Sequence, residues 1–420
     1  MTLRQRVSRR EFLGTTAASA VAMGQSTEST AVRAGETEHF WYREQPPGKY
    51  IDSQRGNRAF AYAEGKIFLS EDNGHHWPHS ADFAGATRIT FSHILKNGNV
   101  LFATGAKLYL STNKLKSHRE IVVKRQDGSD YVPHTPKDAE LPGWYFHTLP
   151  GEVSWDVKGK EMMVWGNYCN VLGGATPVNI YYSTDNGQTV KLAYGFGQNP
   201  HFSDNGAPGG GKGGTLLGDA NNKVVARHVH TVAYNPVENA FYATTGDGTR
   251  ELGHECHWLR GAYDAKNDQW DWKVPVSDVS NSRYKCGGIN FVDGKLYWIS
   301  DSNGPRPHDR GVFMCDPADL ARPEKHVRLF NPEVESACMI VEDGVFLATH
   351  CAPATPLNTG FIVSTDSGKS WAQHDLKEFG KRSPVRLHEK NGEGWFRCDL
   401  RSGWIKQAEV MFIKPKPRRG

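Results

Sequence analysis

The sequence has no excess of charge of either sign and little cysteine. Its 50 lysines and arginines nearly balance 46 aspartates and glutamates, which leaves a net charge of +4 over 420 residues. A chain this close to neutral lacks the strong basic footprint of nucleic-acid-binding proteins, so we expect no nucleic-acid partner. Seven widely spaced cysteines do not resemble the framework of a small disulfide-stapled scaffold, and an odd number leaves at least one thiol unpaired.

Long hydrophobic runs are also absent, except near the start of the chain. Residues 12–23 form an apolar run with basic residues before it and small residues after it, which is the pattern of an export signal. The residues that match the twin-arginine pattern S-R-R-x-F-L are Ser8, Arg9, Arg10, Phe12 and Leu13. We therefore expect residues 1–30 to be a twin-arginine signal peptide. No other run approaches the roughly 18 residues of a membrane helix, so we expect the rest to be periplasmic or secreted, without a membrane partner.

One eight-residue turn occurs three times in the chain. It reads SEDNGHHW at 70–77, STDNGQTV at 183–190 and STDSGKSW at 364–371. Each copy follows a short run rich in β-branched and aromatic residues, and another such run precedes that one. The same pair of runs recurs with altered turns at 107–113, 258–270, 311–320 and 394–406. This makes seven copies, spaced by roughly 55 residues.

The repeat predicts an all-β fold, because no amphipathic helical pattern of any length interrupts it. Short strands with turns at this period are typical of a β-propeller with four-stranded antiparallel blades. We expect a seven-bladed propeller, with six blades as the alternative, in a single domain over residues 38–415. An ordinary β-sandwich would not repeat its turn, and a parallel β-helix has shorter rungs.

The repeated turn S-x-D-x-G-x-x-W resembles the Asp-box, or BNR repeat, of the sialidase-like propeller superfamily. Two copies are complete, and the third has Val190 in the place of the tryptophan. Serine and aspartate side chains can bind nearby backbone N–H groups, and the glycine permits positive φ, so the turn is suited to closing a hairpin. The resemblance implies that it joins the third and fourth strands of a blade, away from the active face.

Candidate binding residues therefore belong to the opposite end of the blades. The loops at 166–178, 245–258, 300–311 and 349–360 are long, and long loops on a rigid scaffold often carry function. His228 and His230 are two residues apart, so they share a face of one predicted first strand. By register, the next first strand offers Tyr284. The residues that we expect to bind substrate around them are Arg88, Asp247, Arg250, Arg306 and Glu335.

The segment HECH is a candidate metal site. Its His254, Cys256 and His257, with Cys286 from the next blade, would supply the four sulfur and nitrogen donors that suit tetrahedral Zn²⁺. A structural zinc ion is the metal that we expect if one binds, and we expect no required cofactor. Two alternatives to a metal site stay open for these residues. They could form a solvated loop, or Cys256 could form a disulfide with a neighbouring blade.

Two groups of sialidase-like propellers imply different reactions. Sialidases hold a substrate carboxylate with arginines, the first in an F/Y-R-I-P motif, which this sequence lacks. The chain also loosely resembles propeller polysaccharide lyases, including ulvan lyases, which use His, Tyr and Arg from neighbouring blades. That resemblance implies Tyr284 as base and acid, His230 or His228 as base or carboxylate partner, and Arg250 with Arg306 as carboxylate clamps.

The sequence thus predicts a monomeric polysaccharide lyase that cleaves an acidic, uronate-containing polysaccharide by β-elimination. Two alternatives stay open. One is a sialidase-like glycoside hydrolase that uses two carboxylates, such as Asp247 with Glu335. The other is a non-catalytic propeller that binds a glycan or a protein.

Overall fold

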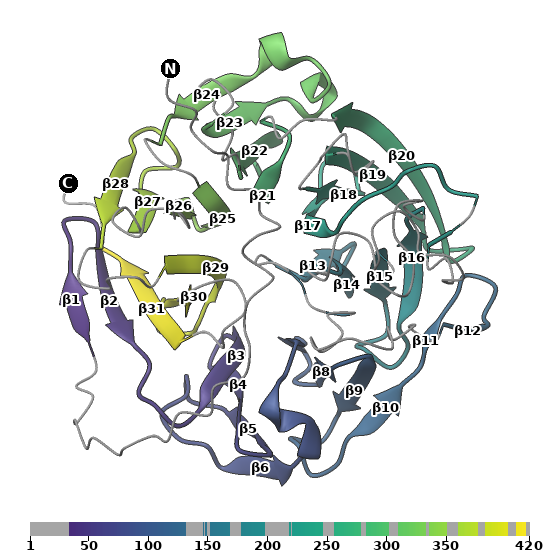
Figure 1. Cartoon of the computed structure of the whole chain (residues 1–420), viewed down its shortest axis with the longest axis vertical. Coiled ribbons are helices and arrows are strands. Elements are labelled where there is room, and N and C mark those ends of the chain that lie inside the picture. Colours follow the sequence, from purple (N-terminus) through teal and green to yellow (C-terminus); the bar gives the residue numbers. More distant parts are fainter. Residues whose placement is uncertain are drawn as a thin grey trace, which may run out of the picture. The chain divides into compact units, whose positions relative to one another are not determined.

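The computed structural model describes most of the chain from Arg33 onward, and Arg33–Gly420 forms one compact unit. The described residues are 33–131, 146, 148, 152–168, 178–197, 218–219, 221–246, 256–278, 283–301, 310–332, 336–350, 360–376, 383–401 and 409–416. They form seven sheets, antiparallel except where β11 pairs parallel with β16, and Figure 1 shows these sheets as the blades of a ring. The predicted all-β, seven-bladed propeller is confirmed.

The first three blades come from the first half of the chain. Blade 1 contains β3 (Tyr50–Arg55), β4 (Arg58–Ala63), β5 (Lys66–Ser70) and β6 (His79–Asp82). Blade 2 contains β7 (Phe91–Ile94), β8 (Val100–Thr104), β9 (Lys107–Ser111) and β10 (Arg119–Ile121). Blade 3 contains β13 (Ser154–Val157), β14 (Lys160–Gly166), β15 (Asn179–Ser183) and β16 (Lys191–Gly195), with β11 (Val123–Lys124) and β12 (Asp130–Tyr131) at its outer edge.

The next three blades follow the same plan. Blade 4 contains β17 (Val229–Asn235), β18 (Ala240–Thr245), β19 (Cys256–Asp264) and β20 (Gln269–Asp278). Blade 5 contains β21 (Cys286–Val292), β22 (Lys295–Ser300), β23 (Val312–Cys315) and β24 (Val327–Phe330). Blade 6 contains β25 (Ser336–Glu342), β26 (Val345–His350), β27 (Gly360–Ser364) and β28 (Ala372–Asp375). The described helical segments are the 3-10 turns η2 (Ala84–Thr87), η6 (Pro317–Asp319) and η7 (Pro323–Lys325).

Blade 7 joins the two ends of the described chain. It contains β29 (Ser383–Lys390), β30 (Phe396–Arg401) and β31 (Glu409–Pro415), and its outer strands are β2 (Phe40–Glu44) and β1 (Ala34–Glu36). β2 pairs antiparallel with β31, from Phe40 opposite Pro415 to Glu44 opposite Met411. The N-terminal strand therefore completes the last blade and closes the ring, a pairing that the repeat pattern did not assign.

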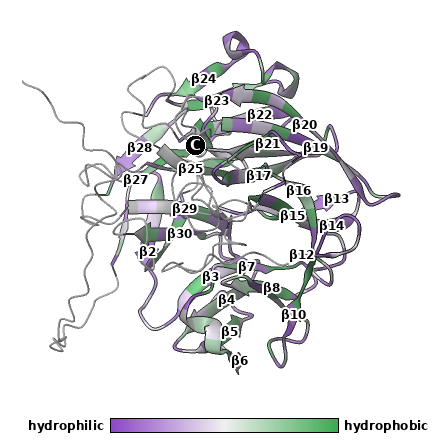
Figure 2. Cartoon of the chain, turned by 45° about the vertical axis from the view of Figure 1, so that its right-hand side comes forward, coloured by the Kyte–Doolittle hydropathy of each residue, from purple (hydrophilic) through white to green (hydrophobic). Residues whose placement is uncertain are grey.

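The core consists of seven apolar clusters, each packed between two neighbouring blades. Figure 2 shows hydrophobic residues along many of the strands and hydrophilic residues in many of the turns. Aromatic side chains join the blades: Phe91 of blade 2 stacks on Trp165 of blade 3, with ring centroids 5.1 Å apart. Trp258 of blade 4 meets Trp298 of blade 5 edge-on at 5.6 Å. The abundance of tryptophan thus serves the contacts between blades.

The three repeated turns share one set of hydrogen bonds. In blade 1 the Oγ atom of Ser70 accepts the N–H of Gly74 at 2.9 Å and donates to Asp72 Oδ1 at 2.7 Å, and Asp72 Oδ1 accepts the N–H of His76. Blades 3 and 6 repeat these bonds with the serine and aspartate of their own turns. In blade 2 the altered turn keeps them, with Asn113 in the place of the aspartate.

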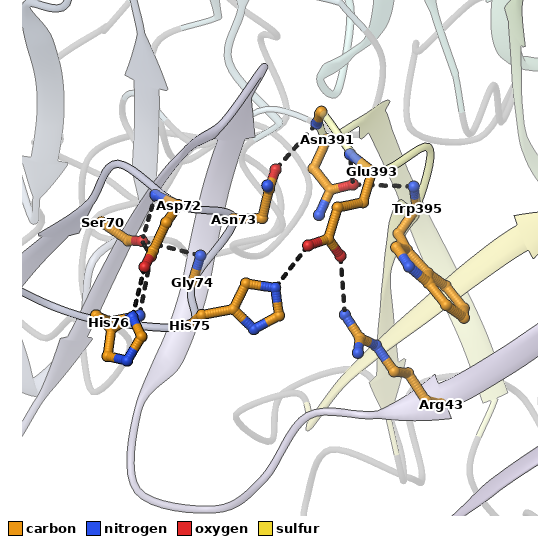
Figure 3. Close-up of polar contacts among 11 residues, drawn as sticks. Arg43, Ser70, Asp72, Asn73, Gly74, His75, His76, Asn391, Glu393 and Trp395 are labelled. Carbon is orange, nitrogen blue, oxygen red and sulfur yellow. Dashed lines mark hydrogen bonds and ion pairs between the residues drawn. The ribbon is translucent and has the colours of Figure 1, made fainter.

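The first of these turns also touches the closing blade. Figure 3 shows it beside residues 391–395, where His75 Nε2 lies 2.6 Å from Glu393 Oε1 and the N–H of Gly392 donates to Asn73 Oδ1 at 3.1 Å. We call the end of the ring that carries the repeated turns the turn end, and the opposite end the loop end. First strands begin at the loop end and finish at the turn end; for example, Ser367 of a repeated turn donates to the carbonyl of Gly344, just after β25.

Candidate functional site

Two histidines at the loop end of blade 4 lie directly against each other. The Nε2 atoms of His228 and His230 are 3.0 Å apart, and the rings stack with centroids 4.9 Å apart. Both residues are buried, with 0 and 1% of their surface exposed. A register shift in the pairing of β17 with β18 falls at His230, and such bulges redirect a side chain. Their predicted proximity is confirmed, while their catalytic role stays a prediction.

Hydrogen bonding decides which way a proton can pass between these rings. His230 Nδ1 lies 2.8 Å from the carbonyl oxygen of Cys286 in blade 5, and a carbonyl can only accept, so Nδ1 carries a proton. In a neutral ring Nε2 of His230 is then an acceptor. The shared proton therefore belongs to Nε2 of His228, and the lone pair of His228 is on its Nδ1. A glycine makes room here, because a Cβ on Gly246 would lie 2.1 Å from His230 Cε1.

A buried ion pair from blade 5 lies beside the histidines. Lys285 is 2% exposed, and its Nζ is 3.3 Å from Asp301 Oδ2. The same carboxylate oxygen is 3.9 Å from His230 Nδ1. The N–H of Asp301 also donates to the carbonyl of Lys285 at 2.7 Å, which holds the two chain segments together. We call His228, His230, Lys285, Asp301 and the neighbouring Tyr168 the loop-end cluster.

Tyr168, not Tyr284, is the tyrosine that the structure brings to this cluster. Tyr168 follows β14 of blade 3, and its ring stacks on His228 with centroids 4.1 Å apart. Tyr284 lies in the core between blades 4 and 5, where its hydroxyl donates to the carbonyl of Leu320 at 2.9 Å. Lys285, one position further on in the turn before β21, lies beside the histidines through its ion pair with Asp301.

The predicted substrate-binding residues fall mostly outside the described part of the chain. Asp247, Arg250, Arg306 and Glu335 lie outside the described residues. Arg88 is described: it is half-buried and precedes β7, and its carbonyl accepts the hydroxyl of Thr104 at 2.8 Å. These five assignments stay predictions.

The predicted zinc ligands have other partners where they are described. His257 Nε2 lies 3.0 Å from the carbonyl of Val225, and its Nδ1 lies 2.8 Å from the hydroxyl of Ser277. Its two ring nitrogens are therefore used within the protein. Cys256 is fully buried, and His254 lies outside the described residues.

The thiol of Cys286 is also poorly suited to bind a metal as it stands. It lies 3.5 Å from the hydroxyl of Thr244, and burial raises its pKa to about 12, whereas a metal ligand must be a thiolate. Across the ranges that the structure describes, no three His, Cys, Asp or Glu side chains are grouped to hold a metal ion. The zinc site stays a prediction that depends on His254. In the same ranges no helix is long and apolar enough to cross a membrane.

The turn end holds a cavity that the sequence did not suggest. It has a volume of about 380 Å³ and is lined by residues in, or next to, the first strands of blades 3 to 7. Its polar lining comes from Glu152, Asp156, Asn290, Glu342 and Glu389. Its aromatic lining comes from Trp155, Tyr234 and Phe291. We call this cavity the axial hollow.

The carboxyl groups of the axial hollow hold protons unusually tightly. Loss of solvation, followed by the neighbouring Glu389 carboxylate, raises the pKa of Glu152 to about 8, although Glu152 is an exposed residue, so solvent weakens this effect. Burial, opposed by its own backbone N–H and reinforced by Glu342, raises the pKa of Glu389 to about 7. Burial also raises the pKa of Glu342, whose carboxylate accepts the N–H of Lys390 at 3.0 Å. Carboxyls with such pKa values in a cavity are candidates for function.

Comparison with known proteins assigns this chain to no family. No protein-family model matches the sequence, and no curated protein matches it. Similar solved structures include YCF48 bound to a D1 peptide, with 12% identity, a TM-score of 0.49, and coverage of 93% of this chain and 99% of that one. YCF48 from Cyanidioschyzon merolae has 12% identity and a TM-score of 0.45, over 89% of this chain and 98% of that one.

A Penicillium chrysogenum α-L-arabinanase complexed with arabinobiose is similar to the same degree. It has 14% identity and a TM-score of 0.43, over 88% of this chain and 99% of that one. At such identities and TM-scores these likenesses carry no argument about function. The class that the described strands define is a seven-bladed β-propeller.

Proposed function

We propose that the protein is an exported polysaccharide lyase that cleaves an acidic, uronate-containing polysaccharide by β-elimination at the loop-end cluster. The observation that supports this proposal is the stacked pair of His228 and His230, with its fixed direction of proton transfer, beside the buried Lys285. β-Elimination needs a base for the C5 proton, an acid for the leaving oxygen and a positive group for the uronate carboxylate. The cluster holds residues of the types that fill all three roles, and because His228 and Lys285 are 0 and 2% exposed, the proposal requires the loop end to open when substrate binds.

In this proposal His228 is the base. Its Nδ1 lone pair takes the C5 proton, and the positive charge is shared through Nε2 with His230, which lies within 3.9 Å of the Asp301 carboxylate. The electron pair of the broken C5–H bond forms the C4–C5 double bond, and the bond from C4 to the glycosidic oxygen breaks. Tyr168, stacked on His228, gives its hydroxyl proton to that oxygen and regains one from the imidazolium.

Cations would hold the uronate carboxylate during this step. Lys285 is a buried ammonium in the cluster, and burial strengthens its attraction for an anion. Arg250 and Arg306, which the lyase resemblance implies as carboxylate clamps, follow β18 and β22 in the sequence. Their proposed role is to bind the acidic chain.

The test is a panel of acidic polysaccharides, with product detected both by new ultraviolet absorbance and by new reducing ends. A lyase produces both, since the double bond absorbs. We expect His228→Asn to lower kcat/KM by about 100-fold or more. The control is His76→Asn at the turn end, whose side chain is 85% exposed and which should keep full activity.

Other outcomes would reject the proposal in favour of a specific alternative. Reducing ends without absorbance would indicate a sialidase-like glycoside hydrolase. Retention of a glycan without any product would indicate a binding propeller. Full activity in His228→Asn would show that the loop-end cluster does not catalyse the reaction.

A further inference from the structure

The outer surface over the boundary between blades 7 and 1 combines aromatic rings with lysine and arginine side chains. We propose that this surface binds an acidic polysaccharide chain, at a site separate from the loop-end cluster. The inference rests on the proposed function only for the class of ligand, and it does not require the cluster to be catalytic. We call this surface the seam strip, and its members are Trp41, Arg43, Lys49, Trp77, Trp395 and Lys414.

Strand pairing places three of these side chains on one face of blade 7. Lys414 of β31 lies directly opposite Trp41 of β2, and Phe412 lies opposite Arg43. Opposite residues of paired strands point to the same side of a sheet, and residues two apart on a strand share that side. Phe412 packs in the core between blades 7 and 1. Trp41, Arg43 and Lys414 therefore lie on the face of blade 7 that is turned toward blade 1.

The tryptophans of the strip lie at the solvent-exposed edge of that same core. Trp395 and Trp77 are half-buried and pack against its apolar residues, while Trp41 is 36% exposed. Lys416 Nζ lies 5.4 Å from the centre of the Trp41 ring and is paired with Glu36 at 2.8 Å, so it adds no uncompensated charge. The apolar face of a sugar ring can pack on a partly exposed tryptophan, because both surfaces are then removed from water.

Cation–π contacts hold the charged side chains of the strip in place. Figure 3 shows Arg43 beside Trp395, and the guanidinium carbon lies 4.6 Å from the ring centre. Lys414 Nζ lies 5.9 Å from the centre of the same ring. Beside blade 1, Lys49 Nζ lies 6.0 Å from the centre of the Trp77 ring. Each contact restricts a long side chain before any ligand arrives, so less conformational entropy is lost on binding.

The strip carries positive charge that its own carboxylates compensate only in part. Among the described residues, no carboxylate pairs with Lys49 or Lys414. Glu393 Oε2 is 3.8 Å from Arg43 Nη2, but the other oxygen of Glu393 lies closer to His75, at 2.6 Å. Uncompensated charges at a surface attract an anion, and their fields add. The strip therefore favours a ligand that carries several negative charges.

An acidic polysaccharide fits this pattern better than a nucleic acid does. The net charge of +4 over 420 residues gives the chain little of the basic footprint that a phosphate backbone requires. A uronate chain offers both groups that the strip can bind, namely carboxylates for the cations and apolar sugar faces for the tryptophans. Several weak contacts along one chain also reinforce each other, since they are linked.

The experiment measures binding of the full chain to polygalacturonate, alginate and hyaluronate, with neutral dextran as the reference polymer. All samples carry His228→Asn, so that the proposed cleavage does not consume the ligand. We expect the protein to be retarded in native gels that contain an acidic polymer and not in gels that contain dextran. Raising NaCl from about 50 to about 300 mM should weaken binding several-fold, because salt screens charges at a surface.

Variants locate the binding. Lys49→Gln with Lys414→Gln should lower the affinity for the acidic polymers at least tenfold, and Trp41→Ala should lower it several-fold. The matched control is Lys107→Gln with Lys295→Gln. It removes two lysines that are 60 and 44% exposed in blades 2 and 5, so net charge changes by the same amount. We expect the control to bind as tightly as its parent.

Four results would overturn the inference. They are failure of all three acidic polymers to bind, unchanged affinity in the variant of Lys49 and Lys414, an equal loss in the control variant, and tighter binding of single-stranded DNA than of the acidic polymers. The last result would indicate a nucleic-acid site. The lyase proposal fails separately: if the wild-type chain forms no product while binding still depends on the strip, the lyase is rejected and this inference stands.

Discussion

Tyr168 stacks on His228 across the boundary between blades 3 and 4, with ring planes inclined by 28°. If this tyrosine is the acid of the proposed elimination, Tyr168→Phe should lower kcat by about 100-fold while the fold is kept. Tyr284→Phe should instead lower the free energy of unfolding by about 1 kcal/mol, because it removes one of the two hydrogen bonds to the carbonyl of Leu320, the other coming from His326. Steady-state kinetics and urea unfolding of both variants separate the two roles. A loss of activity in Tyr284→Phe alone would indicate that Tyr284, which the sequence suggested, is the catalytic tyrosine.

The carboxyls of the axial hollow should make stability fall as the pH rises. Folding raises the pKa of Glu389 from its ordinary value of 4.5 to about 7, so the folded chain binds protons that the unfolded chain releases in this window. Raising the pH from 4.5 through 7 therefore lowers the free energy of unfolding. Glu389→Gln should raise Tm at pH 8 by roughly 2 to 4 °C, after allowance for solvent in the hollow, and change it little at pH 5. Thermal scans across pH test this, and an equal gain at both pH values would contradict it.

The repeated turns should affect stability and leave activity intact. Ser364→Ala removes the oxygen that accepts the N–H of Gly368 at 2.9 Å and orients Asp366. We expect a loss of about 1 to 2 kcal/mol in the free energy of unfolding, since a backbone donor loses its acceptor. Denaturant titration measures the loss, and the polysaccharide assay should show unchanged kcat/KM. Reduced kcat/KM in a fully folded sample would mean that the turn end takes part in catalysis.

A buried charge network joins blade 7 to blade 1. Asp399 is fully buried, forms an ion pair with Arg386, and lies 2.7 Å from the Nη2 atom of Arg397. Asp399→Asn leaves two buried guanidinium groups without their carboxylate, so we expect about 3 to 5 kcal/mol of destabilisation. Glu393→Gln breaks only partly exposed ion pairs at the same seam and should cost about 1 kcal/mol or less. Similar urea midpoints for the two variants would show that the buried network contributes little.

The closing strand β2 offers a comparison of two adjacent aromatic residues. Phe40 is fully buried and meets Phe361 of blade 6 edge-on, while Trp41 on the other face is 36% exposed. Phe40→Ala should destabilise the protein by about 3 to 5 kcal/mol. Trp41→Ala should cost less than about 1.5 kcal/mol. Equal losses would mean that β2 is held by backbone pairing alone.

Local features were readable from the sequence, and long-range features were not. The serine, aspartate and glycine of the repeated turn act within five residues, so their pattern predicted both the hairpin and the blade count. The spacing of His228 and His230 likewise predicted that they lie together. Lys285 was missed in favour of Tyr284 because a register shift in β21 follows these residues, and the side on which a strand presents its side chains depends on such shifts.

The axial hollow had no sequence signal at all. Its carboxyl groups come from blades 3, 6 and 7, and each is an ordinary glutamate near the end or the start of a strand. Only closure of the ring brings them together, and only burial next to one another raises their pKa values. The pairing of β2 with β31 was hidden for the same reason, since nothing near Phe40 indicates a partner at the far end of the chain.

The pairing of β2 with β31 determines when the ring can close during synthesis of the chain. β2 leaves the ribosome early, yet its partner β31 emerges almost a whole chain later, so the nascent polypeptide has a strand with an unsatisfied edge throughout translation. The last blade can form only after β31 has been synthesised, so ring closure comes after the other blades have left the ribosome. The proposed twin-arginine route, which carries folded proteins, suits a molecule whose two ends must meet before it is finished.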